Sequence, residues 1–577
     1  MERRSFLKYS GALAGATALG AVSAPNIAQA SGKSNPRLEP AMNGQPLQTL
    51  SNDLTPYTGA WTPIQVRHLL RRTMLGVPWD QWDAASKMSL PVLVTKLLDT
   101  SAGLPPKPAT WVDEYLAPDT SITDPKLLDI DTHNKASLEA ARVQQLRNWW
   151  LDLMLSTNLS IWEKMTFMWS NHFVTGSGVV GHAGYMYQYS QTLRNNALGN
   201  LKDLVMAIST DPAMLLYLNG NQSYFGQDPK GNFAGNHVNE NFGRELMELF
   251  TLGRLDPKTG AANYTETDIR NAGQALSGWQ PTTSAPFVGK LLPQCHNTSN
   301  KTFFGQTKNF GLTEIIDTIF AQGGGYNIAY FISQRIYTTF VYWVPNPAVI
   351  DTMANLLLSS NWEIKPVMSA LLSSAHFFDT SVMGAHLKSP VEWVGSMVRE
   401  FEITYPTFVA QDPAVKSTDA QGYNSYTDPN PSLTYLSETV AAALGQEILN
   451  PPNVKGWPTG PDWITTKTFQ DRQQMALNLL AYPDPFDGSA GVNGVNLHFK
   501  ADDWMQSYPG QKDIMIKALS SGIEAHIMGL PPGPVETAAL YHVVNVLDLP
   551  EGGWHFSVDY GAGYARSIAT YPEFQLV

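Results

Sequence analysis

Residues 239–253 read NENFGRELMELFTLG, and their spacing predicts a helix with one polar and one apolar side. At about 100° per residue, Glu240, Arg244, Glu248 and Glu245 fall within an arc of about 140°. The opposite half carries leucine, methionine and phenylalanine, which suit a helix packed on a hydrophobic core. Because helix-period patterns recur along the chain, they decide the fold class.

Helical periodicity accounts for most of the sequence after Thr62, and the alternating patterns typical of strands are few. Long connections at 219–238, 279–311 and 405–432 separate some helices, and the last has the Asp, Ser, Asn and Pro content of a flexible insertion. We predict a mainly α, multi-helix globular fold with long irregular loops and little or no sheet. The expected helices are 63–75, 88–99, 134–156, 159–174, 185–207, 239–253, 265–278, 312–320, 327–342, 347–358, 363–375, 389–402, 433–446, 512–528 and 533–547.

Composition limits the classes of partner. With 577 residues the chain is long enough for two or more hydrophobic cores. Its formal charge of −12 predicts no nucleic-acid partner, because binding phosphates needs a basic face. Cys295 is the only cysteine, which rules out an internal disulfide and a thiolate metal cluster. The 16 tryptophans indicate large aromatic-lined surfaces.

The N-terminus resembles a twin-arginine export signal, with Arg3 and Arg4 ahead of a Gly/Ala-rich run and small residues up to Ala30. This run is too short and too rich in glycine for a strong membrane span, so we expect no integral span apart from the signal segment. The predicted organisation is a signal peptide at 1–30, a linker at 31–56, a main helical domain at 57–482 and a C-terminal helical extension at 483–577. The expected location is periplasmic or extracellular, reached in the folded state.

The polar side of residues 239–253 has two interpretations. Glu240 and Arg244 have the i,i+4 spacing of an exposed ion pair, which is typical of a solvated helix face. Asn236, His237 and Asn239, in contrast, are uncharged hydrogen-bonding residues. If the face lines a cleft, Arg244 can hold one carboxylate ionised while an apolar setting raises the pKa of another, which separates an acid from a base. The catalytic candidates are then Glu240, Arg244, Glu245 and Glu248.

His172 is the second catalytic candidate. It lies on the apolar side of the predicted helix 159–174, where a core histidine is expected. The alternative is that it points into the same cleft as Glu240 and acts as a general base, proton shuttle or metal ligand. The sequence contains no HExxH zinc motif, no nucleotide-binding glycine loop and no convincing hydrolase elbow.

Further polar and aromatic residues are candidates for ligand binding. His68 and Arg71 share a helix face, where pairing with acidic neighbours is the alternative. The segment 449–464 contains four prolines, so it is a stiff aromatic loop that can stack on sugars or other flat ligands. Tryptophans buried between packed segments are the alternative there. The remaining candidates are Trp279, His296, Lys388, Lys455 and Trp457.

An ordered set of fragments resembles one known family. The fragments include EKMTFMWSNHF (163–173), YTETDIRNAGQALSGW (264–279), KSPVEW (388–393) and LGQEILNPPNVKGWP (444–458), beside residues 239–253. They resemble the bacterial domain-of-unknown-function family numbered 1800, from about residue 57 to 577. This resemblance implies an exported, mostly helical protein without an established reaction. It also implies a partner, because members are often encoded beside an exported family, numbered 1501, that is similar to sulfatases and alkaline phosphatases.

Three functions remain open at this stage. The first is an enzyme that acts on an extracytoplasmic, glycan-like polymer by carboxylate acid/base chemistry. The second is a non-catalytic partner, scaffold or chaperone of the co-encoded phosphatase- or sulfatase-like protein, with the Glu/Arg face as an interface or a buried network. In the third, His172, Glu163 and Glu240 bind a metal or redox cofactor before export. The sequence specifies neither the metal nor the cofactor.

Overall fold

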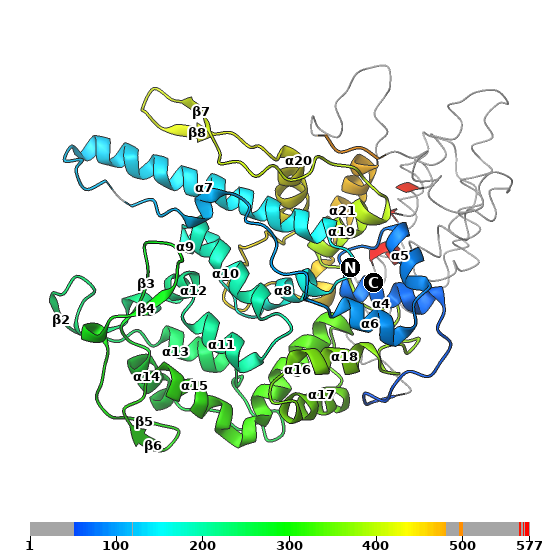
Figure 1. The fold of residues 1–577 in the computed structure, drawn as a ribbon, viewed down its shortest axis with the longest axis horizontal. Helices are drawn as coiled ribbons and strands as arrows, with labels where there is room; N and C mark the ends of the chain where they lie inside the picture. Colours follow the sequence, from blue (N-terminus) through cyan, green and yellow to red (C-terminus); the bar gives the residue numbers. More distant parts are fainter. Residues whose placement is uncertain are drawn as a thin grey trace.

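The computed structural model describes residues 51–117, 119–480, 496–499, 565–566, 569–570 and 572–575. The expected signal peptide and the helices expected at 512–528 and 533–547 lie outside these residues. Within the described part the prediction of a mainly α fold with long loops and little sheet is confirmed (Figure 1). The division at residue 482 stays a prediction.

In the first half of the described chain, α10 contacts α7, α8, α11 and α12. Most side chains of α10 are buried, as expected for a helix with neighbours on several sides. The helices are α4 (Pro63–Thr73), α5 (Trp79–Ser86), α6 (Leu90–Leu97), α7 (Pro125–Ser156), α8 (Trp162–Ser170), α9 (Ser177–Val180), α10 (Ala183–Asn195), α11 (Leu201–Ser209) and α12 (Pro212–Tyr217).

In the second half, α16 packs along α17, and α17 contacts α18 (Figure 1). Two π-helical segments, Leu246–Phe250 and Tyr435–Ala442, directly follow α13 and α20. The helices are α13 (Asn241–Glu245), α14 (Glu266–Ala275), α15 (Leu312–Ala321), α16 (Tyr326–Phe340), α17 (Pro347–Ser359), α18 (Ile364–Leu372), α19 (Pro390–Glu400), α20 (Pro431–Thr434) and α21 (Thr466–Leu479).

The strands in the described residues pair only as antiparallel hairpins, which lie in the three long connections. The segment 405–432, expected to be a flexible insertion, instead contains a hairpin that packs on α7. The Asn134 side chain of α7 donates to the Gly422 carbonyl (3.1 Å) and accepts from the Asn424 N–H (2.8 Å). The strands are β1 (Tyr224–Gln227), β2 (Phe233–His237), β3 (Trp279–Pro281), β4 (Gly289–Leu291), β5 (Lys301–Phe303), β6 (Gln306–Lys308), β7 (Val415–Thr418) and β8 (Asn424–Tyr426).

The prediction missed α5, α9, α12 and α21, and two expected helices have different bounds for reasons that their capping residues explain. The single helix expected at 185–207 is two helices, because the Asn200 side chain accepts from the Lys202 N–H (3.0 Å) and starts α11 afresh. The helix expected from residue 134 begins at Pro125, where Asp124 caps it by accepting from the Lys126 N–H (2.8 Å). Its first turns carry little apolar periodicity, so pattern alone does not find them.

The core runs through α8 and α19. Every residue of α19 is buried, and so is every residue of α8 except Trp162. Charged side chains in such helices need partners, because an isolated buried charge is costly. Lys164 of α8 pairs with Glu392 of α19, which joins the two helices through an ion pair.

Candidate functional site

Residues 239–253 form a helix of mixed type. We predicted one continuous α-helix, but α13 ends at Glu245 and a π-helical turn covers Leu246–Phe250. The buried Thr251 hydroxyl donates to the carbonyl of Leu246, five residues earlier (2.6 Å), which fits the wider π turn. Phe242, Leu246, Met247 and Phe250 are buried, so the expected apolar side is confirmed. Isolated π turns recur at functional sites of proteins.

Glu240 and Arg244 form the ion pair that their spacing indicates, at 3.0 Å. Arg244 also binds Glu266 of α14 at 2.8 Å, and this hydrogen bond raises the pKa of Arg244. The Glu266 side chain is 70% exposed and that of Glu240 is 45% exposed. Exposed pairs of this kind contribute only about 0–1 kcal/mol. The Glu240 end of the face is therefore a largely solvated ion-pair ladder.

Glu245 and Glu248 lie farther along the same face and are partly buried. Burial, followed by the charge of Glu248, raises the pKa of Glu245, while Arg244 and the exposed Lys455 act against this rise. The Tyr264 hydroxyl donates to Glu248 at 3.0 Å, and burial together with this contact raises the pKa of Tyr264. Glu245, Glu248, Tyr264 and Lys455 form a group that we call the carboxylate cluster. Its members come from α13, the π turn and two loops.

His172 lies in the interior, as expected for a core histidine. Its Nε2 is 3.1 Å from the carbonyl oxygen of Phe250, and its ring packs edge-on against Phe173. Burial, together with the charge of Arg335, lowers its pKa to about 3, so the ring is neutral at physiological pH. A neutral imidazole that donates Nε2–H to this carbonyl stabilises the end of the π turn.

The aromatic loop 449–464 is held against the end of α8. Trp457 is buried, stacks on Phe167 at 5.5 Å and donates its backbone N–H to Asn171 Oδ1 (2.6 Å). Gly456 has a φ of +86°, and a Cβ there would lie 2.1 Å from the same Oδ1 atom, so only glycine fits. Trp457 is therefore buried between packed segments and does not present a stacking surface for a ligand. Lys455, in the same loop, is exposed.

His68, Arg71 and Lys388 are buried too. His68 Nε2 is 2.9 Å from the Phe377 carbonyl oxygen, and Arg71 forms an ion pair with Glu400. The Lys388 ammonium lies 3.8 Å from the centre of the Phe574 ring, and burial lowers its pKa well below the usual value. Their contacts join distant parts of the chain inside the core.

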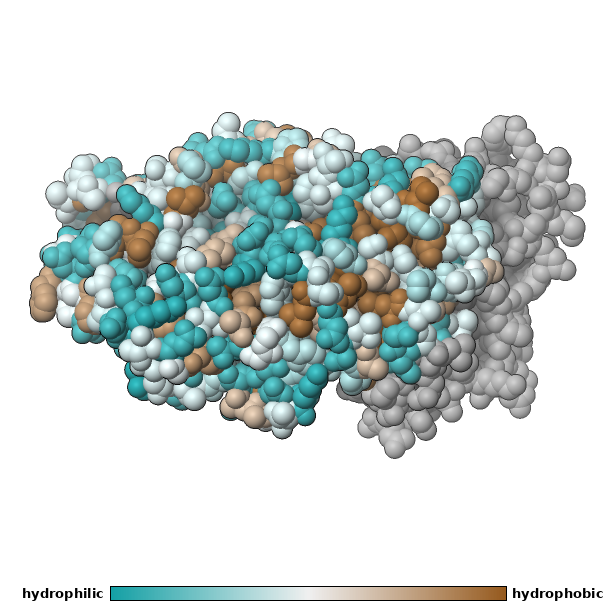
Figure 2. Space-filling view, turned by 60° about the horizontal axis from the view of Figure 1, so that its bottom comes forward, coloured by the Kyte–Doolittle hydropathy of each residue, from teal (hydrophilic) through white to brown (hydrophobic). Residues whose placement is uncertain are grey.

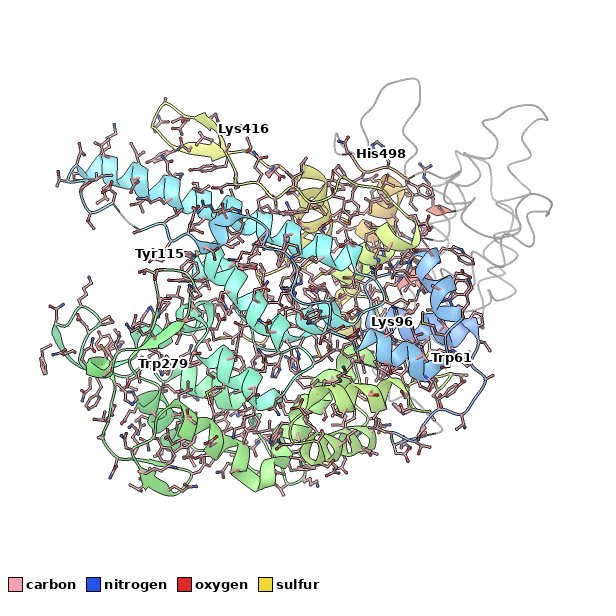
Figure 3. All side chains as sticks on the ribbon, in the orientation of Figure 1. Trp61, Lys96, Tyr115, Trp279, Lys416 and His498 are labelled. Carbon is pink, nitrogen blue, oxygen red and sulfur yellow. The ribbon has the colours of Figure 1, made fainter. Side chains whose placement is uncertain are left out.

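Trp279 and His296 lie together at another edge of the molecule. Trp279 opens β3 on the side that carries the hairpins (Figure 3), and His296 Nδ1 is 2.9 Å from the Ser277 carbonyl oxygen. Ser223 connects this edge to α13, because its carbonyl accepts from Gly278 N–H and its hydroxyl accepts from Asn239 N–H. Within the described residues, no hydrogen bond or ion pair joins Trp279 or His296 to the carboxylate cluster.

A pocket that the sequence did not reveal lies between α8, α16, α19 and the aromatic loop. Its cavity volume is about 70 Å³, and Lys164, His386 and Glu392 are among the residues that line it. Burial alone would raise the pKa of Glu392, but Lys164, His386 and hydrogen bonds lower it to about 2. The sequence signals were Lys164 directly after Glu163 in a largely buried helix and a glutamate inside KSPVEW. Their convergence required the fold.

The third hypothesis was a metal or redox cofactor held by His172, Glu163 and Glu240. No group of three or more His, Cys, Asp or Glu side chains in the part of the chain that the structure describes could hold a metal ion. Glu163, one of the three residues considered, is bound by Arg194 at 2.7 and 2.8 Å and by the Trp150 indole at 2.8 Å. His172 and Glu240 are occupied by the contacts described above.

Comparison with known proteins identifies two matches. A model of twin-arginine translocation pathway signal sequences matches residues 1–20, so the protein carries a signal for export by that route. None of the helices in the described residues is both long enough and apolar enough to span a membrane. No curated protein and no solved structure matches the chain. A family model described as "Protein of unknown function (DUF1800)" matches residues 68–576, and because this covers nearly the whole chain, the protein belongs to the DUF1800 family.

Proposed function

We propose that this exported protein is an enzyme that acts on a glycan-like extracytoplasmic polymer, with Glu245 as the general acid and Glu248 as the carboxylate base or nucleophile. The observation that carries the proposal is the half-buried Glu245, whose pKa is raised by burial and by Glu248. A carboxyl group that keeps its proton at higher pH can protonate a leaving-group oxygen.

The neighbours of the two carboxyl groups suit these roles. Tyr264 fixes Glu248 through a hydrogen bond of 3.0 Å, so this carboxylate has a defined orientation. Lys455 is exposed beside Glu245 and can hold a polar group of the substrate. Glu240 and Arg244 form the adjacent ion pair at 3.0 Å, which we assign to positioning rather than to proton transfer. Glycosidic hydrolysis needs two carboxyl groups about 5–10 Å apart, a separation that neighbouring helical positions can provide.

The experiment compares Glu245→Gln and Glu248→Gln with the wild type for the release of reducing ends from a panel of neutral and acidic bacterial polysaccharides. Each variant should lose about 10²–10⁴-fold in turnover, because proton transfer or nucleophilic attack is removed. Thermal stability should stay nearly unchanged. Glu314→Gln is the matched control, since Glu314 is an exposed carboxylate of α15 outside the cluster.

Wild-type activity should also fall as the pH rises through the raised pKa of Glu245, because the acid form is then lost. No release from any polymer by the wild type, or unchanged turnover of Glu245→Gln, would contradict the proposal. A loss of several degrees in melting temperature for Glu245→Gln would show that the cluster is a structural network.

The second function, partnership with the co-encoded phosphatase- or sulfatase-like protein, is supported by one surface feature. Phe233 of the β1–β2 hairpin is 88% exposed, and an aromatic side chain presented this way is typical of an interface anchor. On the face shown in Figure 2, hydrophobic residues are interspersed among hydrophilic ones. Isolated exposed hydrophobic residues of that kind are common on protein surfaces, so they are weaker candidates for an interface than Phe233.

Phe233→Ser should reduce co-purification with the co-encoded exported protein at least about tenfold, without changing the melting temperature. Val179→Ser is the control, because Val179 is 65% exposed on α9 and away from the hairpin. Equal recovery of the partner with both variants would rule out this hairpin as the interface.

A further inference from the structure

We propose that the pocket between α8, α16, α19 and the aromatic loop binds a small molecule that carries an oxyanion, namely a carboxylate, phosphate or sulfate group. The pocket lining shares no residue with the carboxylate cluster, and the inference does not depend on the proposed function. It rests on the hydrogen-bonding groups that face the pocket, on the surplus of buried positive charge beside it and on the volume available.

The pocket presents hydrogen-bond donors whose hydrogens are not used within the protein. The Lys164 ammonium has three N–H groups, and Glu392 is its partner among the described residues. The amide oxygen of Gln446 accepts from the Val391 N–H (2.9 Å), which leaves its NH₂ group without a partner in the described part of the chain. Both donors line the pocket. They are placed to bind an acceptor-rich group.

Two smaller donors extend this set. Asn171 Oδ1 accepts from Trp457, and its NH₂ group has no partner in the described ranges. The Ser389 hydroxyl accepts from the Glu392 N–H (3.4 Å) and has no acceptor for its own hydrogen among the same residues. The hydroxyls of Thr338 and Thr339, in contrast, donate to backbone carbonyls of α16. The pocket therefore offers mainly N–H and O–H groups near Lys164.

Both oxygens of the Glu392 carboxylate are already bound within the protein. Glu392 Oε1 binds Lys164, and Glu392 Oε2 accepts from the Ser389 N–H at 2.7 Å. His386, buried beside this pair, has no hydrogen-bond partner within the described residues, and its Nδ1 is inaccessible. The Glu392 carboxylate therefore has a partner for each oxygen and leaves room for the negative charge of a ligand beside Lys164.

Positive charge exceeds negative charge around the pocket. Arg72 and Arg472 are fully buried, and Arg335 is partly buried and holds the Asn171 carbonyl at 3.3 Å. None of the three has a carboxylate within ion-pair distance among the residues described. Burial lowers the pKa of Arg72 and of Arg472 to about 9, against the charge of Glu392, so both remain charged at neutral pH. A bound oxyanion would offset this surplus.

The walls of the pocket limit the ligand to a small molecule. Phe167 and Trp463 add buried aromatic surface to the lining. The cavity volume of about 70 Å³ is well below the roughly 300–1,000 Å³ of sites for drug-sized ligands, so the pocket suits a small anion. An ion of the size of phosphate, sulfate or acetate fits this combination of polar centre and apolar wall.

The test is calorimetric titration of the purified protein with inorganic phosphate, sulfate and acetate at constant ionic strength, with glucose as a neutral comparison. We expect saturable binding of at least one anion and none of glucose. Gln446→Glu is isosteric and keeps the oxygen that accepts from Val391, but it replaces donors with negative charge. It should weaken anion binding at least about tenfold. Gln474→Glu makes the same change at an exposed position of α21 and should have no effect.

If Gln446→Glu does not fold, a second pair of variants tests the same proposal. Thr338→Glu places a carboxylate in the pocket, and Thr132→Glu makes the same change on an exposed face of α7. Both hydroxyls donate to the carbonyl four residues earlier, so the helical context is matched. Binding should be lost only in Thr338→Glu. Absence of saturable anion binding in the wild type, or equal binding by Thr338→Glu and Thr132→Glu, would overturn the proposal.

Discussion

Burial decides what each charged residue of this protein contributes. Glu163 and Arg194 are buried and joined by two hydrogen bonds of 2.7 and 2.8 Å, so removing one partner would strand the other in the core at a cost of about 3–5 kcal/mol. Glu240 and Arg244 have equally good contact geometry at 3.0 Å, but solvent screens them. Both pairs consist of a glutamate and an arginine, so the residue types alone do not show which pair is buried.

Burial also changes how tightly a carboxyl group holds its proton, and Asp211 is an example. Its carboxylate caps α12 by accepting from the Ala213 N–H (3.0 Å) and also accepts from the Thr192 hydroxyl (2.8 Å), yet burial raises its pKa to about 7. The folded state therefore binds a proton more tightly than the unfolded chain, whose aspartate has a pKa near 4. Asp211 should make the protein less stable as the pH rises from about 4 to about 7.

We predict that Asp211→Asn removes this dependence while keeping the cap. The free energy of unfolding of the wild type, minus that of the variant, should fall by up to about 1.4 kcal/mol per pH unit across the window. Urea unfolding at several pH values measures it. Asp203→Asn, at an exposed position of α11, is the control and should show no such trend. A difference that does not change with pH would contradict a raised pKa.

At the scale of elements, side chains outside a helix decide where it begins, ends or widens. The π turn after Glu245 follows from contacts such as that of Thr251 with Leu246, and these are not part of the hydrophobic pattern. The same applies to the β7–β8 hairpin, which lies beside α7 with Lys416 at its outer strand (Figure 3). Local composition predicted a flexible insertion there, but contacts with a helix about 290 residues away in sequence hold it.

Asn134→Ala should release this hairpin from α7. The change removes one donated and one accepted hydrogen bond, with Gly422 and Asn424, and a lost hydrogen bond typically costs about 0.5–1.5 kcal/mol. Hydrogen exchange of amides in 415–426 should accelerate about tenfold or more, whereas the global melting temperature should stay the same. Asn355→Ala, on an exposed turn of α17, is the control. Unchanged exchange would show that other contacts hold the hairpin.

At the scale of the whole molecule, buried ion pairs and hydrogen bonds join segments that are far apart in the chain. Lys164 links α8 to α19 through Glu392, and Arg71 links α4 to α19 through Glu400. Arg472 of α21 donates both to Gln575 Oε1 and to the Lys388 carbonyl, each at 3.0 Å. The C-terminal turn Pro572–Gln575 thereby packs on the core beside Phe401. Of these contacts, the ion pair of Lys164 and Glu392 lies in the wall of the proposed anion pocket.

The sequence by itself determined the export signal, the mainly helical fold class and the amphipathic character of residues 239–253, because these depend on local composition and on the period of the pattern. It also identified Glu245 and Glu248 as residues to examine. Only the tertiary structure decided which charges are buried, where α13 gives way to a π turn, and that Lys164, His386, Glu392 and Gln446 share one pocket. Burial and the pairing of distant residues depend on the whole packed chain, and no local pattern encodes them.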